Sequence, residues 1–200
     1  MRKISATYIF PGNQSPLKNG ILVCSNDGRI IRLENTEGRL KEQAGLEHYS
    51  GILVPGFITL SFLRQTHHQK KEYQRPRENS TLFWVLALSD KAYTSYPYPL
   101  EYPLPEDQFT ICLGTPSGAS LQSIVLSQLQ FLQEHHPEIP LEKLIRWATL
   151  NGAYALQVEK EQGSLEPGKN PGIYLITGVD LINLKLTSRS RIKTLIPHSS

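Results

Sequence analysis

The chain has 200 residues, enough for one ordinary domain or for two small domains that share a core. With 39% hydrophobic and 20% charged residues, its composition is that of a soluble globular protein. A net charge of +3 is too small to indicate a nucleic-acid-binding protein, and no apolar run approaches the roughly 18 residues of a membrane span. The first residues carry no leader pattern, so we expect a cytoplasmic protein that binds neither nucleic acid nor membrane.

Residues 1–57 have the pattern of β-structure. Apolar runs at 3–10, 21–24, 29–33 and 51–57 predict four strands, the last of them buried. The Asp27-Gly28 pair supplies the positive φ that a tight hairpin turn needs. Residues 34–48 are polar and predict a loop or an edge.

The middle of the chain alternates between short strands and irregular segments. Residues 81–88 and 109–113 are apolar and predict two strands, whereas 64–80 are charged and without periodicity. Four basic residues in that charged segment indicate a solvated loop rather than a phosphate site: Lys70, Lys71, Arg75 and Arg77. Tyrosines and prolines interleave over 93–108, which excludes a helix and favours an extended connection.

Two helices and a short third are predicted after this connection. Apolar residues at helical spacing run from Leu121 to Leu132, with Ser117 or Ser120 available as the cap. Pro140 suits the first position of a second helix, and Thr149 can cap a third that runs through 153–156. The chain then returns to β-structure at 173–177, 184–187 and 192–196.

Neither the cysteines nor the histidines form a pattern that is typical of a metal site. Cys24 and Cys112 are far apart and are expected to be small buried residues within strands. The adjacent pairs His67-His68 and His135-His136 chelate poorly, because neighbours point apart in both strands and helices. We expect solvated or helix-capping roles for these four. Segment 114–120 could hold an anion at a helix N-terminus, but it fits neither phosphate-loop pattern.

Six segments taken in order resemble the amidohydrolase superfamily, in particular its cytosine-deaminase-like and chlorohydrolase-like branch. They are IFPG at 9–12 with NGILV at 19–23, DGRI at 27–30, LVPGFI at 53–58, ICLGT at 111–115, WATLNGA at 147–153 and GSLEPGK at 163–169. Each is weak alone. Together they follow the family's order at both ends of the chain.

The resemblance implies a fold of mixed α and β class. In the family, both termini build a composite β-sandwich beside a (β/α)₈ barrel that holds one or two divalent metals. We therefore expect residues 1–57 and 163–197 to form the sandwich. Residues 58–162 would form a truncated barrel remnant of about three strands and three helices. A full barrel takes about 250 residues, so the middle strands are expected to be missing near 64–80.

The metal-ligand positions that the resemblance implies do not hold ligands here. The family's His-x-His pair on the first barrel strand would fall at Ser61 and Leu63, and its last-strand aspartate at Pro116. The seventh-strand pattern is likewise replaced, at 87–91. His67 and His68 remain as displaced candidates.

These observations leave three hypotheses for function. The first is a degenerate, non-catalytic amidohydrolase-like protein without catalytic, metal-binding or cofactor-binding residues. The second is an active hydrolase or deaminase of non-peptide carbon–nitrogen bonds that uses displaced ligands and zinc or iron. The third is an interaction module using the Tyr/Pro segment 93–105. A shortened barrel exposes sheet edges, so we also expect a homodimer or another protein partner.

Overall fold

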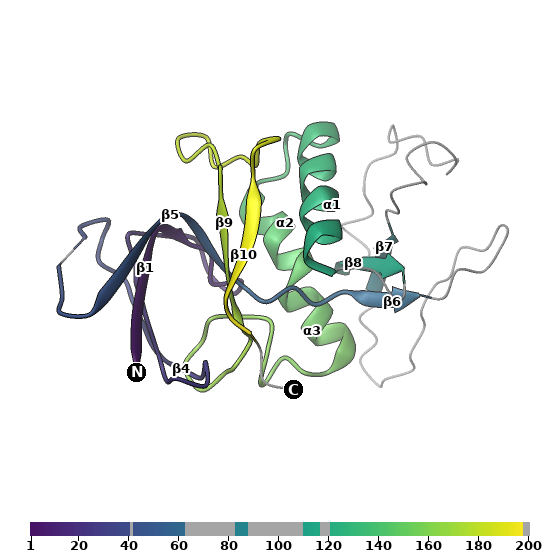
Figure 1. The fold of residues 1–200 in the computed structure, drawn as a ribbon. Coiled ribbons are helices and arrows are strands. Elements are labelled where there is room, and N and C mark those ends of the chain that lie inside the picture. The colour runs from purple at the N-terminus through teal and green to yellow at the C-terminus, as the bar shows by residue number, and fades with distance from the viewer. Residues whose placement is uncertain (41, 63–82, 88–109, 117–120, 198–200) are drawn as a thin grey trace, which may run out of the picture.

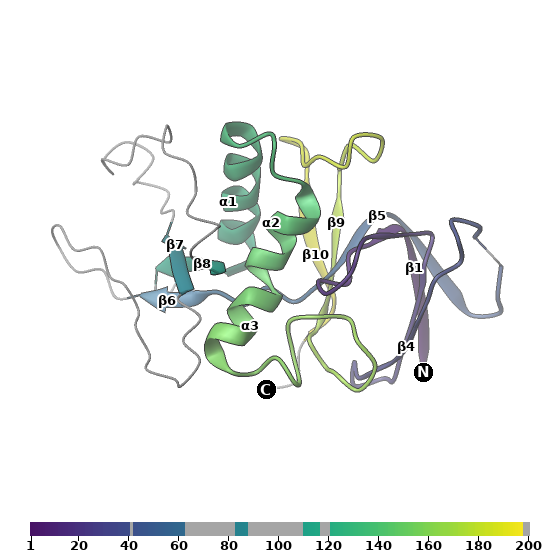
Figure 2. The same cartoon turned by 180° about the vertical axis from the view of Figure 1, so that it is seen from behind.

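A computed structural model describes residues 1–40, 42–62, 83–87, 110–116 and 121–197. The fold is of mixed α and β class, with ten strands and three helices in the described residues (Figures 1 and 2). The strands are β1 (Arg2–Ile9), β2 (Leu17–Lys18), β3 (Ile21–Cys24), β4 (Ile30–Glu34), β5 (Leu46–Pro55), β6 (Leu60–Phe62), β7 (Phe83–Ala87), β8 (Thr110–Pro116), β9 (Ile173–Thr177) and β10 (Arg191–Ile196). The helices are α1 (Leu121–His135), α2 (Leu141–Ala148) and α3 (Leu150–Leu156).

Strands from both ends of the chain form one open, mixed, seven-stranded sheet. Its order is β10-β9-β5-β1-β3-β4, and β2 pairs with β1. The strand regions predicted at 3–10, 21–24, 29–33, 51–57, 173–177 and 192–196 are all present. The described strands of the two termini thus share a single hydrogen-bonded sheet. The composite sandwich stays a prediction.

The segment 34–48 was predicted as a loop or an edge, but its last three residues belong to strand β5. β5 begins at Leu46 because this polar stretch pairs in parallel with β1, from Lys3↔Leu46 to Ala6↔Tyr49. Strand formation here depends on a partner more than 40 residues away, so the local pattern could not indicate it.

The two faces of the large sheet bury different sets of side chains. On one face, Ile52 lies opposite Ile176 and Val54 opposite Tyr174, and all four belong to the cluster that packs against the helices. On the other face, Leu53 lies opposite Leu175 in a second cluster made by the strands themselves. This period of two accounts for the continuous apolar run in β5, because both of its faces are buried.

The predicted hairpin between β3 and β4 is confirmed. Gly28 has a φ of 92°, and its N–H donates to the carbonyl of Ser25 over 3.1 Å. A Cβ added at Gly28 would lie 2.7 Å from Cγ2 of Ile196, so both conformation and space require glycine.

An ion pair joins the starts of β1 and β5. Nη2 and Nε of Arg2 donate to the two carboxylate oxygens of Glu47 over 2.8 and 2.9 Å, and the Tyr49 hydroxyl donates to Glu47 over 2.8 Å. The hydrogen bonds from Arg2, opposed in part by burial, lower the pKa of Glu47 from 4.5 to about 2.

We expect Glu47→Gln to lower the free energy of unfolding at pH 7 by about 1 kcal/mol. The depressed pKa makes the contribution of Glu47 complete above pH 4.5, and it is lost as the pH falls through about 2. Urea unfolding at a series of pH values should therefore show the variant and the wild type converging toward acid. The exposed Glu134→Gln is the control, and a difference that persists unchanged at acid pH would contradict the assignment.

The helices lie between the large sheet and a smaller one (Figures 1 and 2). α1 buries Val125, Leu129 and Leu132, and α2 buries Leu141, Leu144 and Ile145. The buried sides of both helices share one cluster with Ile111 and Leu113 of β8 and with the large sheet. None of the helices in the described ranges is both long enough and apolar enough to cross a membrane.

Two predicted helix starts need correction. Pro140 is the N-cap of α2, with extended backbone angles, and is not its first helical residue. Thr149 occupies the N-cap position of α3, but its hydroxyl donates to the carbonyl of Ile145 over 2.8 Å and caps nothing. The predicted caps Ser117 and Ser120 lie outside the described residues.

The strand predicted at 184–187 is wrong, because a helix side chain takes the place of a neighbouring strand. Nε2 of Gln133 donates to the Leu186 carbonyl over 3.0 Å, and the Leu186 N–H donates to Oε1 of Gln133 over 2.9 Å. Gln130 also donates to the Thr187 carbonyl over 2.6 Å. These backbone groups are thus satisfied without a sheet partner.

Replacing Gln133 with leucine is expected to cost about 1–3 kcal/mol of unfolding free energy, since the N–H and carbonyl of the buried Leu186 lose their partners. Thermal or urea denaturation measures the loss. Ser127→Ala, at an exposed site on the same helix, should change little. Equal stability of the Gln133 variant and the wild type would show that the two hydrogen bonds between Gln133 and Leu186 do not contribute to the free energy of unfolding.

Candidate functional site

The smaller sheet contains two of the positions at which the sequence predicted lost ligands, Ser61 and Pro116. Its order is β6-β8-β7, and all three strands run parallel. These are the segments that resemble the first, last and seventh strands of the family's barrel. In a closed eight-stranded parallel barrel the last strand lies between the first and the seventh, which is the order found here.

The register brings two of the three vestigial positions together. Ser61 pairs with Thr115 and Phe62 with Pro116, so Ser61 and Pro116 are one pair apart on neighbouring strands. Pro116 is the last residue of β8 and Ser61 the middle residue of β6. Parallel α/β folds place their sites at the carboxyl ends of their strands. Leu63 lies outside the described residues.

The side-chain chemistry at these positions does not fit a zinc or iron site. Such metals take histidine, cysteine or carboxylate ligands. Serine offers a neutral hydroxyl, and leucine and proline offer no donor atom. Across the described parts of the chain, no three His, Cys, Asp or Glu side chains gather as a metal site.

The histidines occupy separate places in the structure. His48 is exposed on β5, with Nδ1 3.3 Å from the Ser5 hydroxyl. His135 is exposed at the end of α1, where Nδ1 lies 2.9 Å from the Phe131 carbonyl and the two rings stack. His136 is only 7% exposed and lies 3.3 Å from a Glu138 oxygen. Of the two expected roles, solvated or helix-capping, burial removes the first for this residue. The displaced candidates His67 and His68 lie outside the described residues.

Both cysteines are buried within strands, as predicted. Burial raises the pKa of the Cys112 thiol to about 12 and also raises that of Cys24. A thiol with so high a pKa is protonated at neutral pH and is a poor nucleophile. Both side chains are also inaccessible to solvent, which fits the role of small buried residues.

A partly buried polar network in the turn 163–169 was missed by the sequence reasoning. Nζ of Lys169 donates to the Ser164 hydroxyl over 2.7 Å, and both residues contact the Glu166 carboxylate. Burial alone would raise the pKa of Glu166, but the hydrogen bonds from Lys169 and Ser164 lower it. Ser164 is inaccessible to solvent, so this serine–lysine pair holds the turn and cannot attack a substrate.

Two hollows adjoin α2. One, of about 320 Å³, lies between the loop after β1 and the side chains of Lys143 and Arg146. The other, of about 310 Å³, lies between the α1–α2 connection and the β9–β10 connection, and Phe10 lines both. Neither includes a residue of β6, β7 or β8, so neither coincides with the vestigial positions.

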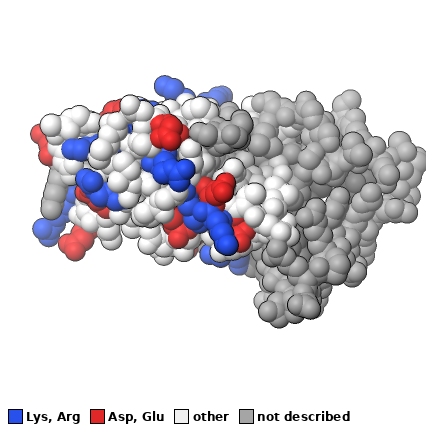
Figure 3. All heavy atoms as spheres, turned by 90° about the horizontal axis from the view of Figure 1, so that it is seen from below, with Lys and Arg blue, Asp and Glu red and all other residues white. Residues whose placement is uncertain are grey.

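Lysine, arginine and acidic side chains are interspersed over the face of the molecule shown in Figure 3. The described part of this face carries no large patch of purely basic or purely acidic side chains. This distribution agrees with the small net charge of +3.

Comparison with known proteins supports the resemblance that the motifs suggested. A model of the amidohydrolase family matches residues 103–196, which include β8, all three helices, β9 and β10. Imidazolonepropionase of Picrophilus torridus is 36% identical over 76 residues, which are 38% of this chain. The match spans only 19% of that relative's length.

A solved structure shares the fold at low sequence identity. It is a Bifidobacterium longum protein provisionally assigned as a prolidase, with a TM-score of 0.51 and 12% identity. The alignment covers 92% of this chain and 91% of that one. The family model and the sequence relative thus show that residues 103–196 and a 76-residue stretch are similar to amidohydrolases, and the solved structure shows a shared fold.

Proposed function

We propose that this chain is a degenerate amidohydrolase-like protein that binds no catalytic metal and does not hydrolyse substrate. The observation that carries the proposal is the register of β6 and β8. Ser61 lies one pair from Pro116 on neighbouring strands, and the family resemblance implies a histidine and an aspartate at these two positions. Neither residue can replace those ligands, and the third position, Leu63, has no donor atom.

The length of the chain supports the same proposal. Residues 58–162 fall far short of the about 250 that a full barrel takes. The division of the chain into a composite β-domain of 1–57 and 163–197 and a barrel remnant of 58–162 belongs to this proposal. The branch of the family, cytosine-deaminase-like or chlorohydrolase-like, is likewise part of it.

Restoring the family's ligands tests whether the vestigial positions are identified correctly. The triple variant S61H/L63H/P116D would supply two imidazoles and a carboxylate. We expect it to bind zinc more tightly than the wild type in a competition assay with a chromophoric chelator. A matched variant, S61A/L63A/P116A, should behave as the wild type. Equal zinc affinity in all three proteins would overturn the assignment of the positions.

The second candidate function is a metal-dependent hydrolase that uses displaced ligands, and the family match favours it. His67 and His68 are its ligand candidates. Replacing both with alanine should then abolish any hydrolysis of non-peptide carbon–nitrogen bonds that the wild type performs. Activity that survives this double substitution would exclude them. The Tyr/Pro segment 93–105 lies outside the described residues, so its role as an interaction module stays a prediction.

We also propose that a second copy or another protein covers the outer edges of β6 and β7. Each pairs only with β8 among the described strands, and parallel sheets are rarely left with open faces or edges. If a second copy is the partner, amide exchange in β6 and β7 should slow as protein concentration rises. Exchange that is independent of concentration would contradict the homodimer.

A further inference from the structure

A single isoleucine stands out from the described surface. Ile182, in the connection between β9 and β10, is 94% exposed, whereas the other exposed large hydrophobic residues away from the N-terminus reach at most 45%. Most of its apolar neighbours turn inward. Val179, Leu181 and Leu184 pack partly against the main core cluster.

The turn that carries Ile182 is held by several hydrogen bonds. Oδ1 of Asp180 accepts the N–H groups of Ile182 and Asn183 over 3.0 and 3.1 Å, and Oδ2 accepts from the Asn183 side chain over 2.7 Å. Asp180 and Lys185 exchange two backbone hydrogen bonds of 2.8 and 3.0 Å. Leu184 adopts a φ of 51°, which a leucine rarely does. The isoleucine is therefore presented by a preorganised turn, which reduces the entropy lost when it binds a partner.

A hollow that can receive an apolar side chain lies beside the turn. Its volume is about 310 Å³, and apolar side chains of Phe10, Pro137, Ile139 and Leu141 contribute to its lining. Asn183, Leu184 and Lys185 form its wall on the side of the turn. Ile182 thus lies one to three residues in sequence from the part of the lining that the turn supplies.

The rim of the hollow is charged with opposite signs on its two sides. Glu138 and Glu142 stand on the side of the helices, and Lys185 stands on the side of the turn. If two copies met on this surface about a twofold axis, the turn of one would lie against the helical side of the other. Lys185 of each copy would then face the acidic pair of its partner, so the surface is complementary to itself.

We infer that this surface, which we call the 182 surface, binds a second copy of the chain about a twofold axis. Ile182 of each copy fills the hollow of the other, and Lys185 pairs with the acidic rim. This inference goes beyond the proposed function, because it uses neither the vestigial ligand positions nor the edges of β6 and β7. Metal binding can therefore be absent or present without affecting it.

Sedimentation velocity over a range of concentrations tests the inference. The wild type should dimerise, and Ile182→Asp should raise the dimer dissociation constant about tenfold or more. Ile31→Asp, which changes an isoleucine that is 44% exposed on β4, is the matched control and should leave the constant unchanged. A monomeric wild type, or equal dissociation constants for wild type and Ile182→Asp, would overturn the proposal.

Charge reversal and cross-linking identify the contacts. Lys185→Glu should weaken the dimer, and Glu138→Lys with Glu142→Lys in the same chain should restore it. In a second experiment, chains carrying Ile182→Cys are mixed with size-tagged chains carrying Glu138→Cys and oxidised. A mixed disulfide-linked dimer is expected. Its absence, while the wild-type dimer persists, would show that a different surface forms that dimer.

Discussion

Replacing Gly152 with alanine is expected to lower the free energy of unfolding by about 2–3 kcal/mol, although alanine in an ordinary helix interior is about 1 kcal/mol more stable than glycine. The sign reverses because Gly152 of α3 lies directly against the chain that leaves the large sheet. A Cβ at this position would come within 2.2 Å of the Ile58 carbonyl oxygen. That oxygen belongs to the backbone and cannot move aside alone.

The surrounding contacts leave little room for relaxation. The Ile58 N–H donates to the carbonyl of Ala148 over 2.8 Å, which fixes the segment against the end of α2. Nδ2 of Asn151 donates to the Ile111 carbonyl over 2.6 Å, which fixes α3 against β8. The glycine thus sits where the path toward β6 crosses the helices.

Urea denaturation of Gly152→Ala measures the effect. Tyr154→Ala, at a half-exposed position of the same helix, is the control and should cost less than the Gly152 variant. A more stable Gly152→Ala protein would mean that Ile58 does not approach the helix so closely, and the described route into β6 would have to be abandoned.

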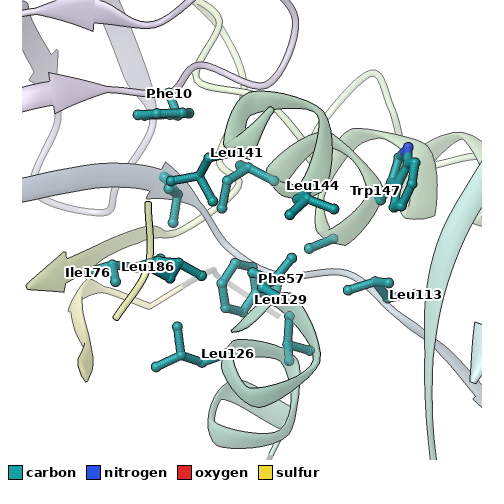
Figure 4. Packing of buried hydrophobic residues seen from close by; sticks show 14 of the residues in the cluster. Phe10, Phe57, Leu113, Leu126, Leu129, Leu141, Leu144, Trp147, Ile176 and Leu186 are labelled. Atoms are coloured by element: carbon teal, nitrogen blue, oxygen red, sulfur yellow. The ribbon is translucent and has the colours of Figure 1, made fainter. Parts of the chain in front are cut away.

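Truncating Phe57 to alanine should cost about 3–5 kcal/mol, the range for removing a large buried aromatic side chain. Phe57 is 5% exposed and lies amid Leu126, Leu129 and Leu186 in the core cluster (Figure 4). Its ring meets Tyr174 of β9 edge to face, with centroids 5.6 Å apart. It therefore joins the large sheet to the helices.

A graded series separates the volume of Phe57 from its aromatic contact. Phe57→Leu retains most of the apolar volume and should cost less than about 1.5 kcal/mol if packing alone matters. A loss larger than this would assign the remainder to the edge-to-face contact with Tyr174. Near-equal stability of Phe57→Ala and wild type would contradict the position of this ring in the core.

Features of the fold that depend on neighbouring residues could be predicted from the sequence. The hairpin at Asp27-Gly28 follows from one turn residue and two flanking apolar runs, and α1 follows from its apolar spacing. The end of α1 before Pro137 was predicted by the same reasoning. Such signals lie within a few residues of the elements that they specify.

The errors arose where the partner of a segment lies far along the chain. Residues 184–187 resemble a strand, but Gln133 supplies their hydrogen bonds. Residues 46–50 look polar and irregular, yet β1 pairs with them in parallel. No local pattern contains this information.

At the candidate site, too, some features could be predicted from the sequence and others could not. The motifs placed Ser61 and Pro116 on the first and last strands of a presumed barrel, and β6 and β8 are neighbours as that assignment requires. The network of Ser164, Glu166 and Lys169 was not predicted, because the sequence reasoning treated its segment only as a turn. The role of Leu63, His67 and His68 stays a prediction, since these positions lie outside the described residues.

The metal content of the wild-type chain tests the central proposal most directly. The protein should be purified without chelator, loaded with excess zinc or iron(II), desalted and examined by elemental analysis beside S61H/L63H/P116D. We expect the wild type to retain far less than one ion per chain, and the triple variant to retain more. A stoichiometric zinc or iron ion in the wild type, lost on replacing His67 and His68, would contradict the proposal and favour a hydrolase with displaced ligands.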